Sequence, residues 1–333
     1  MRAVLCKSFG PPESLVIESV ADPVAGPGQV VVDVWAAGVN FPDTLIIENK
    51  YQLKPSLPFS PGGEIAGVVS EVGPDVTSPV VGDRVIVVSG FGGFAERVVT
   101  QAAAAHLVPD GMDLVTAAGF VMAYGTSYHA LKDRGQLQPG ESLLVLGAAG
   151  GVGLAAVELG DAMGAMVIAA ASSESKLEVC RSRGAAATVD YSHDNLRDRL
   201  RELTDGRGVD VIYDPVGGDL AEPAVRSLAW NGRYLVVGFA AGTIPNIPLN
   251  LPLLKGASIV GVFWGAFVGR QAADNARNLV ELSQLFTAGK LRPLVSRTYP
   301  LEDAAQALTD MANRQVTGKV VLVTERGAAE AGQ

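Results

Sequence analysis

The fold is decided by residues 143–153, which read Leu-Leu-Val-Leu-Gly-Ala-Ala-Gly-Gly-Val-Gly. The stretch combines a short apolar run, a turn of small residues and a helix that opens at Val152. Without side chains in the way, a pyrophosphate can approach the backbone, and the helix N-terminus supplies free N–H groups. The spacing is Ala-x-Gly-x-x-Gly rather than the full Gly-x-Gly-x-x-Gly, so the strand-turn-helix context carries the prediction. We expect a dinucleotide site lined by Gly150, Gly151, Val152 and Gly153, although tight packing in any α/β turn is the alternative.

The segments around this turn alternate between strands and helices. Short apolar runs at 167–170, 209–213 and 234–237 are separated by helix-like stretches. Such runs are typical of a parallel sheet covered on both faces. Two helical segments are expected within 270–313, followed by a strand at 319–323 and a frayed tail at 326–333.

Residues 1–100 have a different pattern. Short β-branched runs at 30–34, 64–69 and 84–88 are separated by Gly-Pro, Gly-Asp and Gly-Gly sequences that favour turns. The length of 333 residues suggests about two domains. The sequence therefore predicts an α/β protein with a β-rich first domain.

Composition excludes several classes of protein. The chain is 48% hydrophobic and 18% charged, which argues against disorder. A net charge of −9 makes nucleic acid and anionic membranes poor partners. Two cysteines and three unclustered histidines are too few for a disulfide framework or a four-thiolate zinc site. With no signal-peptide pattern and no apolar run of roughly 18–20 residues, we expect a cytoplasmic protein.

The segment after the second apolar strand bears on the choice of cofactor. An NAD site usually places an acid there, about 20 residues beyond the glycine turn, to hold the ribose hydroxyls. Residues 170–176 instead read Ala-Ala-Ser-Ser-Glu-Ser-Lys. The hydroxyl of Ser172 and the ammonium of Lys176 suit a 2′-phosphate, which predicts NADPH. The alternative is that Lys176 is a solvated helix residue and that Glu174 holds the ribose.

Several motifs, in order along nearly the whole chain, resemble the medium-chain dehydrogenase/reductase superfamily, in its zinc-free quinone oxidoreductase (zeta-crystallin-like) branch. The resemblance implies a GroES-like β-rich catalytic domain at 1–121 and 266–333, and a Rossmann NADPH-binding domain at 122–265. The motifs that carry it are Gly38-Val39-Asn40-Phe41-Pro42-Asp43, Pro61-Gly62-Gly63-Glu64, Gly82-Asp83-Arg84-Val85, Gly125-Thr126-Ser127-Tyr128, the turn at 148–153 and Tyr213-Asp214-Pro215-Val216-Gly217-Gly218.

The sequence departs from the zinc alcohol dehydrogenases at their metal ligands. Those enzymes carry a cysteine where this chain has Asn40 and a histidine where it has Gly63. Their structural-zinc loop holds four cysteines, whereas residues 89–105 hold none here. A catalytic zinc needs about three protein ligands, so we expect no metal site. Without a Lewis acid to ionise an alcohol, reduction of an electrophilic acceptor is favoured.

The resemblance also implies roles for three polar residues. Asn40 would face the nicotinamide and hydrogen-bond a quinone carbonyl, or else only cap a turn. Tyr51 resembles a tyrosine of enoyl-thioester reductases that donates a proton or binds the acyl carbonyl, and a surface aromatic is the alternative. Thr126 matches a threonine whose hydroxyl lies near the nicotinamide ring.

Further cofactor contacts are expected beyond the turn. Tyr191 resembles a tyrosine at the adenosine-phosphate end, and Arg314 an arginine that reaches the phosphates, unless it is a solvated helix end. Trp264 is either at the cleft or in the interdomain core. The residues expected to border the nicotinamide half are Gly238, Phe239, Phe263 and Trp264, which follow strands of the predicted sheet.

The leading functional interpretation is an NADPH:quinone reductase. An enoyl reductase acting on α,β-unsaturated thioesters or ketones is the second, and an NADPH-binding structural or regulatory protein that needs no turnover is the third. Residues 257–263 are apolar and β-branched and fall at the end of the expected strand order. A free edge of that kind predicts a homodimer, unless a helix of the same chain covers it.

Overall fold

The computed structural model describes residues 1–331, which fold as two units. The first unit combines residues 1–122 with the chain from Pro293 onward, and the second unit spans Ala123–Arg292. The expected fold class, a GroES-like sheet with a Rossmann sheet, is confirmed. The sequence analysis placed the unit boundaries after residues 121 and 265, whereas the second one falls after Arg292.

The second boundary differs because helix α10, Ala272–Thr287, is bonded to helix α3, Val121–Tyr128, and to the π-helical turn His129–Arg134 that follows it. The Tyr128 hydroxyl donates to Glu281 over 2.6 Å, and Lys132 Nζ donates to Asn278 over 3.1 Å. The sequence pattern shows that α10 is a helix but not which unit its apolar face meets.

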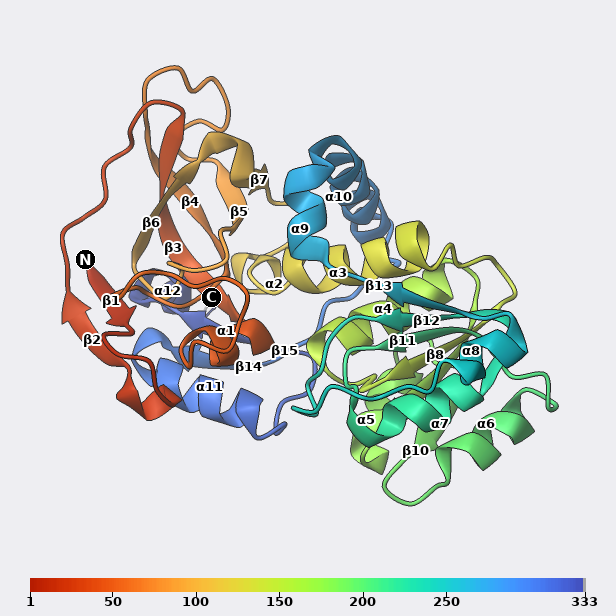
Figure 1. Cartoon of the computed structure of the whole chain (residues 1–333). Helices are drawn as coiled ribbons and strands as arrows, with labels where there is room; N and C mark the ends of the chain where they lie inside the picture. Colours follow the sequence, from red (N-terminus) through yellow and green to blue (C-terminus); the bar gives the residue numbers. More distant parts are fainter. Residues whose placement is uncertain (332–333) are drawn as a thin grey trace. The chain divides into compact units, whose positions relative to one another are not determined.

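The second unit is built on a six-stranded sheet in which all neighbouring strands are parallel, in the order β10-β9-β8-β11-β12-β13. Helix α4 packs on β8 and β9. Helix α7 contacts both α6 and α8 (Figure 1). The strands are β8 (Ser142–Leu146), β9 (Met166–Ala171), β10 (Ala187–Asp190), β11 (Val209–Asp214), β12 (Leu228–Val236) and β13 (Ser258–Gly261). The remaining helices are α4 (Gly151–Ala162), α5 (Glu174–Arg181), α6 (Leu196–Leu203), α7 (Ala221–Arg226), α8 (Asn250–Lys255) and α9 (Trp264–Arg270).

The buried strands explain why this sheet forms. Side chains of β8 and β11, such as Leu144, Leu146 and Ile212, have no exposed surface. Burial of each large apolar side chain contributes roughly 1.5–3 kcal/mol to folding. A sheet buried on both faces needs apolar residues at consecutive positions, which accounts for the unbroken runs in the sequence.

The first unit is a seven-stranded sheet in the order β14-β15-β3-β4-β5-β7, with β6 also paired to β3, and a separate β1–β2 hairpin (Figure 1). The longest strand, β3, joins both pieces of the chain, because its neighbour β15 comes from the C-terminal piece. The strands are β1 (Arg2–Leu5), β2 (Val16–Ser19), β3 (Gln29–Val39), β4 (Glu64–Val72), β5 (Arg84–Val88), β6 (Arg97–Gln101), β7 (Ala105–Leu107), β14 (Val295–Pro300) and β15 (Lys319–Val323). The helices are α1 (Phe41–Ile46), α2 (Leu114–Ala117), α11 (Ala304–Ala312) and α12 (Glu325–Ala331).

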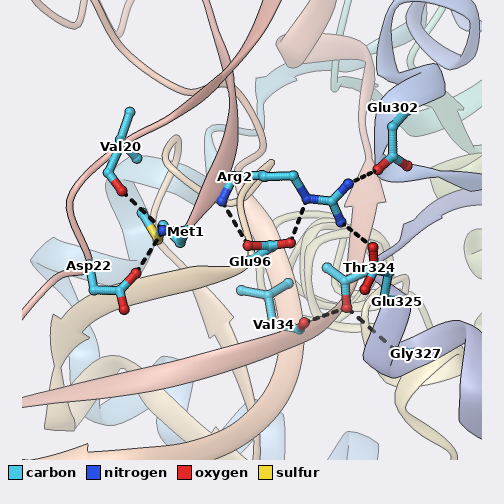
Figure 2. A network of polar contacts seen from close by, with 10 residues as sticks. All are labelled: Met1, Arg2, Val20, Asp22, Val34, Glu96, Glu302, Thr324, Glu325 and Gly327. Atoms are coloured by element: carbon cyan, nitrogen blue, oxygen red, sulfur yellow. Dashed lines mark hydrogen bonds and ion pairs between the residues drawn. The ribbon is translucent and has the colours of Figure 1, made fainter.

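Residues 325–331 are helical, in a segment where the sequence predicts a frayed tail. Helix α12 occupies the described part of that segment. It is held by Thr324, whose hydroxyl donates to the Val34 carbonyl over 2.7 Å, and by Arg2, which bonds Glu325 over 2.9 Å (Figure 2). Arg2 also bonds Glu96 and Glu302, so one guanidinium joins three acidic side chains.

A buried carboxylate joins both ends of the second unit. The Glu158 side chain, 3% exposed on α4, accepts a hydrogen bond from the Tyr124 hydroxyl over 2.7 Å. It also accepts from Arg183 and from the backbone N–H of Arg292, each over 2.9 Å. Tyr124 lies near the first residue of the unit, and Arg292 is its last residue.

Among the helices in the described part of the chain, none has the length and apolar character needed to cross a membrane.

Candidate functional site

The glycine turn lies between β8 and α4. Gly147 has a φ of +58°, which favours glycine, and its carbonyl oxygen would lie 2.3 Å from any Cβ added at Gly153. Only glycine at 153 therefore lets the helix begin so close to the strand. The Ala148 N–H donates to the Ala170 carbonyl over 3.0 Å, which ties the turn to β9. The structure thus has the small-residue cradle and helix start that a pyrophosphate needs.

The end of β9 holds the residues predicted to select the cofactor. Lys176 Nζ lies 3.5 Å from Ser172 Oγ, so the lysine folds back from α5 toward the strand end. The Glu174 carboxylate is instead paired with Arg181. Tyr191 lies directly beyond β10, and its N–H donates to the Ala171 carbonyl over 3.1 Å. Ser172, Lys176 and Tyr191 are therefore neighbours, while Glu174 is engaged elsewhere.

Thr126 lies on α3 next to a hydroxyl that touches the turn. The Ser127 hydroxyl donates to the Val152 carbonyl over 2.8 Å and lies 2.9 Å from the Tyr213 hydroxyl. Because Ser127 and Tyr213 are buried, these bonds fix α3 against the first turn of α4. Thr126 is held one residue away from that contact.

The loops after β11 and β12 lie together. Asp214 Oδ1 accepts the N–H groups of Val216 and Gly217 over 2.7 and 2.8 Å, and burial raises the pKa of this carboxyl. A Cβ added at Gly217 would lie 2.9 Å from the Phe239 ring, and one at Gly238 would lie 3.2 Å from the Pro215 carbonyl. Gly238 and Phe239 therefore border the loop that Asp214 organises.

After β13, Phe263 and Trp264 differ in their surroundings. Phe263 is 57% exposed, whereas Trp264 is 7% exposed, and its ring would contact a Cβ added at Gly125 at 2.9 Å. Trp264 thus packs on α3 inside the second unit, one residue from Thr126. Apart from Arg314, the residues expected to bind the cofactor follow the carboxyl ends of strands in the parallel sheet, the edge at which such sheets bind ligands.

In the first unit, Asn40 follows β3 as the N-cap residue of α1 and is 8% exposed. Its side-chain oxygen accepts a hydrogen bond from Lys319 Nζ over 2.5 Å. Its side-chain nitrogen donates to the Gly38 carbonyl over 3.2 Å and to Glu64 Oε2 over 3.3 Å. The Asn40 backbone N–H donates to Asp43 Oδ2 over 2.8 Å. Asn40 is thus both a helix cap and part of a cluster of buried charges.

Tyr51 is half-buried against the core of the first unit. Burial raises the pKa of its hydroxyl, and the negative charge of Asp43 raises it further. Tyr51 therefore lies within electrostatic reach of the Asn40 cluster. Arg314 is exposed just beyond α11 in the first unit, whereas the glycine turn belongs to the second.

Comparisons with known proteins agree with this architecture. Residues 26–110 match the alcohol dehydrogenase GroES-like domain, and residues 151–282 match the zinc-binding dehydrogenase family. The quinone oxidoreductase-like protein 2 homolog of Nematostella vectensis is 42% identical over 98% of this chain and 89% of its own length. The chain belongs to the quinone oxidoreductase family of the medium-chain dehydrogenases/reductases.

Several solved structures share this fold. A mycobacterial member complexed with NADPH is 30% identical, with a TM-score of 0.90 over 97% of this chain and 100% of its own. The Escherichia coli quinone oxidoreductase complexed with NADPH is 28% identical, with a TM-score of 0.91 over the same shares. The CurK enoyl reductase is 25% identical, with a TM-score of 0.88 over 97% of this chain and 99% of its own. Our protein is thus an oxidoreductase of this type.

Within residues 1–331 of the oxidoreductase, no group of three or more His, Cys, Asp or Glu side chains is placed to hold a metal ion. A Cβ added at Gly63 would lie 3.1 Å from the Met122 methyl and 3.2 Å from the Gly90 carbonyl, so the position is tightly enclosed. His129 bonds Asp133 over 2.8 Å and stacks on Phe267, which is a structural role.

Sequence reasoning assigned no role to Lys319, Glu64 or Asp43 of the oxidoreductase. Glu64 and Asp43 stood inside motifs used only to identify the family. The sequence pattern places Lys319 at the start of an apolar strand and indicates no function for it. The available signal was the charge itself, because a lysine in a Lys-Val-Val-Leu-Val strand must find buried partners.

Replacing Asp43 by asparagine should change how stability depends on pH. Burial raises the pKa of Asp43 from 3.8 to about 7, against the hydrogen bond from Asn40 and the charge of Lys319. The folded protein therefore keeps a proton that the unfolded chain releases near pH 4. The contribution is complete below about pH 4 and is lost as pH rises through about 7, by up to ~1.4 kcal/mol per pH unit.

Urea unfolding between pH 4 and 7.5 should show this fall in wild type and not in Asp43→Asn. The exposed Asp75→Asn variant should keep the wild-type pH dependence. An unchanged slope in Asp43→Asn would show that Asp43 is ionised throughout this range.

Proposed function

We propose that the protein reduces a quinone with NADPH and works without zinc. The observation that carries the proposal is the gathering of the 150–153 turn and the Ser172–Lys176 pair at one edge of a parallel sheet. The relatives named quinone oxidoreductase or quinone oxidoreductase-like protein, and the NADPH in two similar structures, support this choice of acceptor and cofactor.

The residues of the turn and of the segment that follows β9 fit the pyrophosphate and the 2′-phosphate of the cofactor. Backbone N–H groups at the start of α4 would bind the pyrophosphate. The Lys176 ammonium and the Ser172 hydroxyl would bind the 2′-phosphate, which needs a cation and a donor in an otherwise acidic protein. When bound, NADPH supplies a hydride.

The first unit supplies the polar group for the acceptor. The Asn40 side-chain N–H would hydrogen-bond the carbonyl oxygen that gains negative charge during reduction. A hydroquinone can take its protons from water, so no relay of acid and base is needed. Asn40 stands where the zinc enzymes have a thiolate, which is why we propose a metal-independent reaction.

An enoyl reductase is the second candidate. The CurK enoyl reductase has the same fold, and the Tyr51 hydroxyl lies within reach of the Asp43 charge. A tyrosine at the substrate could donate the proton that an enoyl reduction requires.

NADPH oxidation with 9,10-phenanthrenequinone and with crotonyl-CoA, measured side by side, tests the proposed function. We expect faster turnover of the quinone, no stoichiometric zinc by elemental analysis, and a rate unchanged by EDTA. Preference for crotonyl-CoA would support the enoyl reductase instead, and loss of activity with EDTA would contradict zinc independence.

Replacing Lys176 by alanine should weaken the binding of NADPH but not that of NADH. A charged hydrogen bond contributes about 1.5–3 kcal/mol, so the NADPH KM should rise roughly 10–150-fold. NADH lacks the phosphate, so its KM should hardly change, and the quinone kcat at saturating NADPH should stay near wild type. Steady-state kinetics with both cofactors measures this, with the exposed Lys290→Ala as control. Equal weakening of both cofactors would mean that Lys176 holds the pyrophosphate or the fold.

We further propose that the protein is a homodimer paired through β13. This strand is the edge of the parallel sheet and has no neighbour beyond it in the described chain. Apolar side chains around it are exposed to solvent, namely Trp230, Leu253, Leu254, Ile259 and Phe263. An exposed edge rimmed by such residues favours pairing with a second copy.

Sedimentation equilibrium at micromolar concentration should give twice the chain mass of 34.5 kDa. Ile259→Lys should dissociate the dimer, because a charge on an edge strand opposes pairing. Val280→Lys, at an exposed apolar residue of α10, is the matched control and should remain dimeric. A wild-type monomer would rule out this dimer.

A further inference from the structure

Lys319 is a buried charged residue at a position in the sheet where an apolar side chain would be expected. It is the first residue of β15, and its side chain is 6% exposed. A lysine is seldom buried, because removing its charge from water costs several kcal/mol even when it is paired. Apolar residues of similar volume often replace a buried ion pair with no loss of stability. Stability of the strand therefore does not explain this lysine.

Each proton of the ammonium group has an acceptor. Nζ donates to Asn40 Oδ1 over 2.5 Å, to the Val39 carbonyl over 3.2 Å and to Glu64 Oε2 over 3.3 Å. The other Glu64 oxygen accepts the Met122 N–H over 2.7 Å. Glu64 has no exposed surface, so Lys319 and Glu64 neutralise each other inside the protein. The shortest of the lysine's bonds goes to the asparagine and not to the carboxylate.

This contact determines which way the Asn40 amide faces. An ammonium group has donors and no acceptor, so the side-chain oxygen of Asn40 must point to Lys319. The NH₂ group is then held on the opposite side, where its two partners are the Gly38 carbonyl and Glu64 at 3.2 and 3.3 Å. Both distances lie at or beyond the upper end of the usual range, so an incoming acceptor can compete for one of these protons.

We propose that Lys319 is a positioning residue, which locks the Asn40 amide so that it offers the acceptor an N–H donor and no free oxygen. The inference rests on the proposed function and narrows it. A carbonyl oxygen that gains negative charge needs a donor, whereas oxidation of an alcohol needs a group that accepts its proton. With its oxygen occupied by Lys319, Asn40 serves carbonyl reduction. The nearby positive charge also strengthens the N–H as a donor while the acceptor oxygen becomes negative.

A double-mutant cycle tests this role. Lys319→Met should lower kcat with 9,10-phenanthrenequinone roughly 10–100-fold, about the effect of one charged hydrogen bond. In the Asn40→Ala background the same change should lower kcat less than about 2-fold, because the amide through which the lysine acts is gone. Lys319→Arg keeps the donor and should recover most of the rate. NADPH binding, followed by fluorescence titration, should match wild type in every variant.

Controls separate positioning from folding. Lys319→Met leaves Glu64 unpaired, so Lys319→Met/Glu64→Gln keeps the interior neutral and should melt near wild type while remaining slow. Lys7→Met removes a lysine whose ion pair with Glu18 is exposed, and should leave kcat unchanged. If the losses from Lys319→Met and Asn40→Ala simply add, or if the lysine variant binds NADPH weakly, the positioning role is wrong.

Failure of the proposed function gives a different result. If wild type reduces neither the quinone nor an enone with NADPH, the proposed reaction is wrong and the positioning role fails with it. If wild type reduces only enones, the quinone assignment is wrong. The kcat values of the double-mutant cycle are then measured with an enone, because its carbonyl needs the same hydrogen-bond donor. Additive losses in an active enzyme contradict the role of Lys319 alone.

Discussion

The antiparallel pairing of β3 with β15 is the constraint on which the first unit depends. It sets Val39 opposite Val320 and Gly38 opposite Val321, so the two pieces of the chain form one sheet. Lys319 and Asn40 are 279 residues apart in sequence and adjacent in space because of this register. Closing so long a loop costs entropy that local contacts cannot offset, so the asparagine is fixed only when both pieces are folded. The chemistry of the first unit is therefore a property of its tertiary structure.

The second unit relies on a different geometrical rule. In a parallel sheet the loops that follow the strands all lie at the same edge. The loops after these six strands therefore come together although they are far apart in the sequence. Ser172 and Tyr191 come from neighbouring strands whose register sets Asp190 opposite Ala171. The helix starts and glycine turns at this edge expose backbone N–H groups, which suit anions even though the protein carries a net charge of −9.

Local patterns predicted what depends on local structure. The glycine turn, the apolar strand before it and the place of Tyr191 after β10 could all be derived from short stretches of sequence, because strand and turn preferences act over a few residues. The partners of Lys319 could not be predicted, because Asn40 and Glu64 lie more than 250 residues away in the sequence and no periodic pattern links them to it. Helix α12 was missed for the same reason, because Thr324 and Arg2 hold it through contacts with distant strands. The unit to which α10 belongs likewise depends on Glu281 meeting Tyr128.

Glu158 holds together the two ends of the second unit, which its sheet alone would not do. Tyr124 and Arg292, near the two ends of this insert, are bonded to the same carboxylate, so the points where the chain enters and leaves are fastened together. When the two ends of an inserted unit lie close together, the rest of the chain needs only a short gap to accommodate it. Close chain ends are the feature that lets a domain be inserted into another chain. The buried carboxylate thus holds the two ends of the inserted unit close to each other.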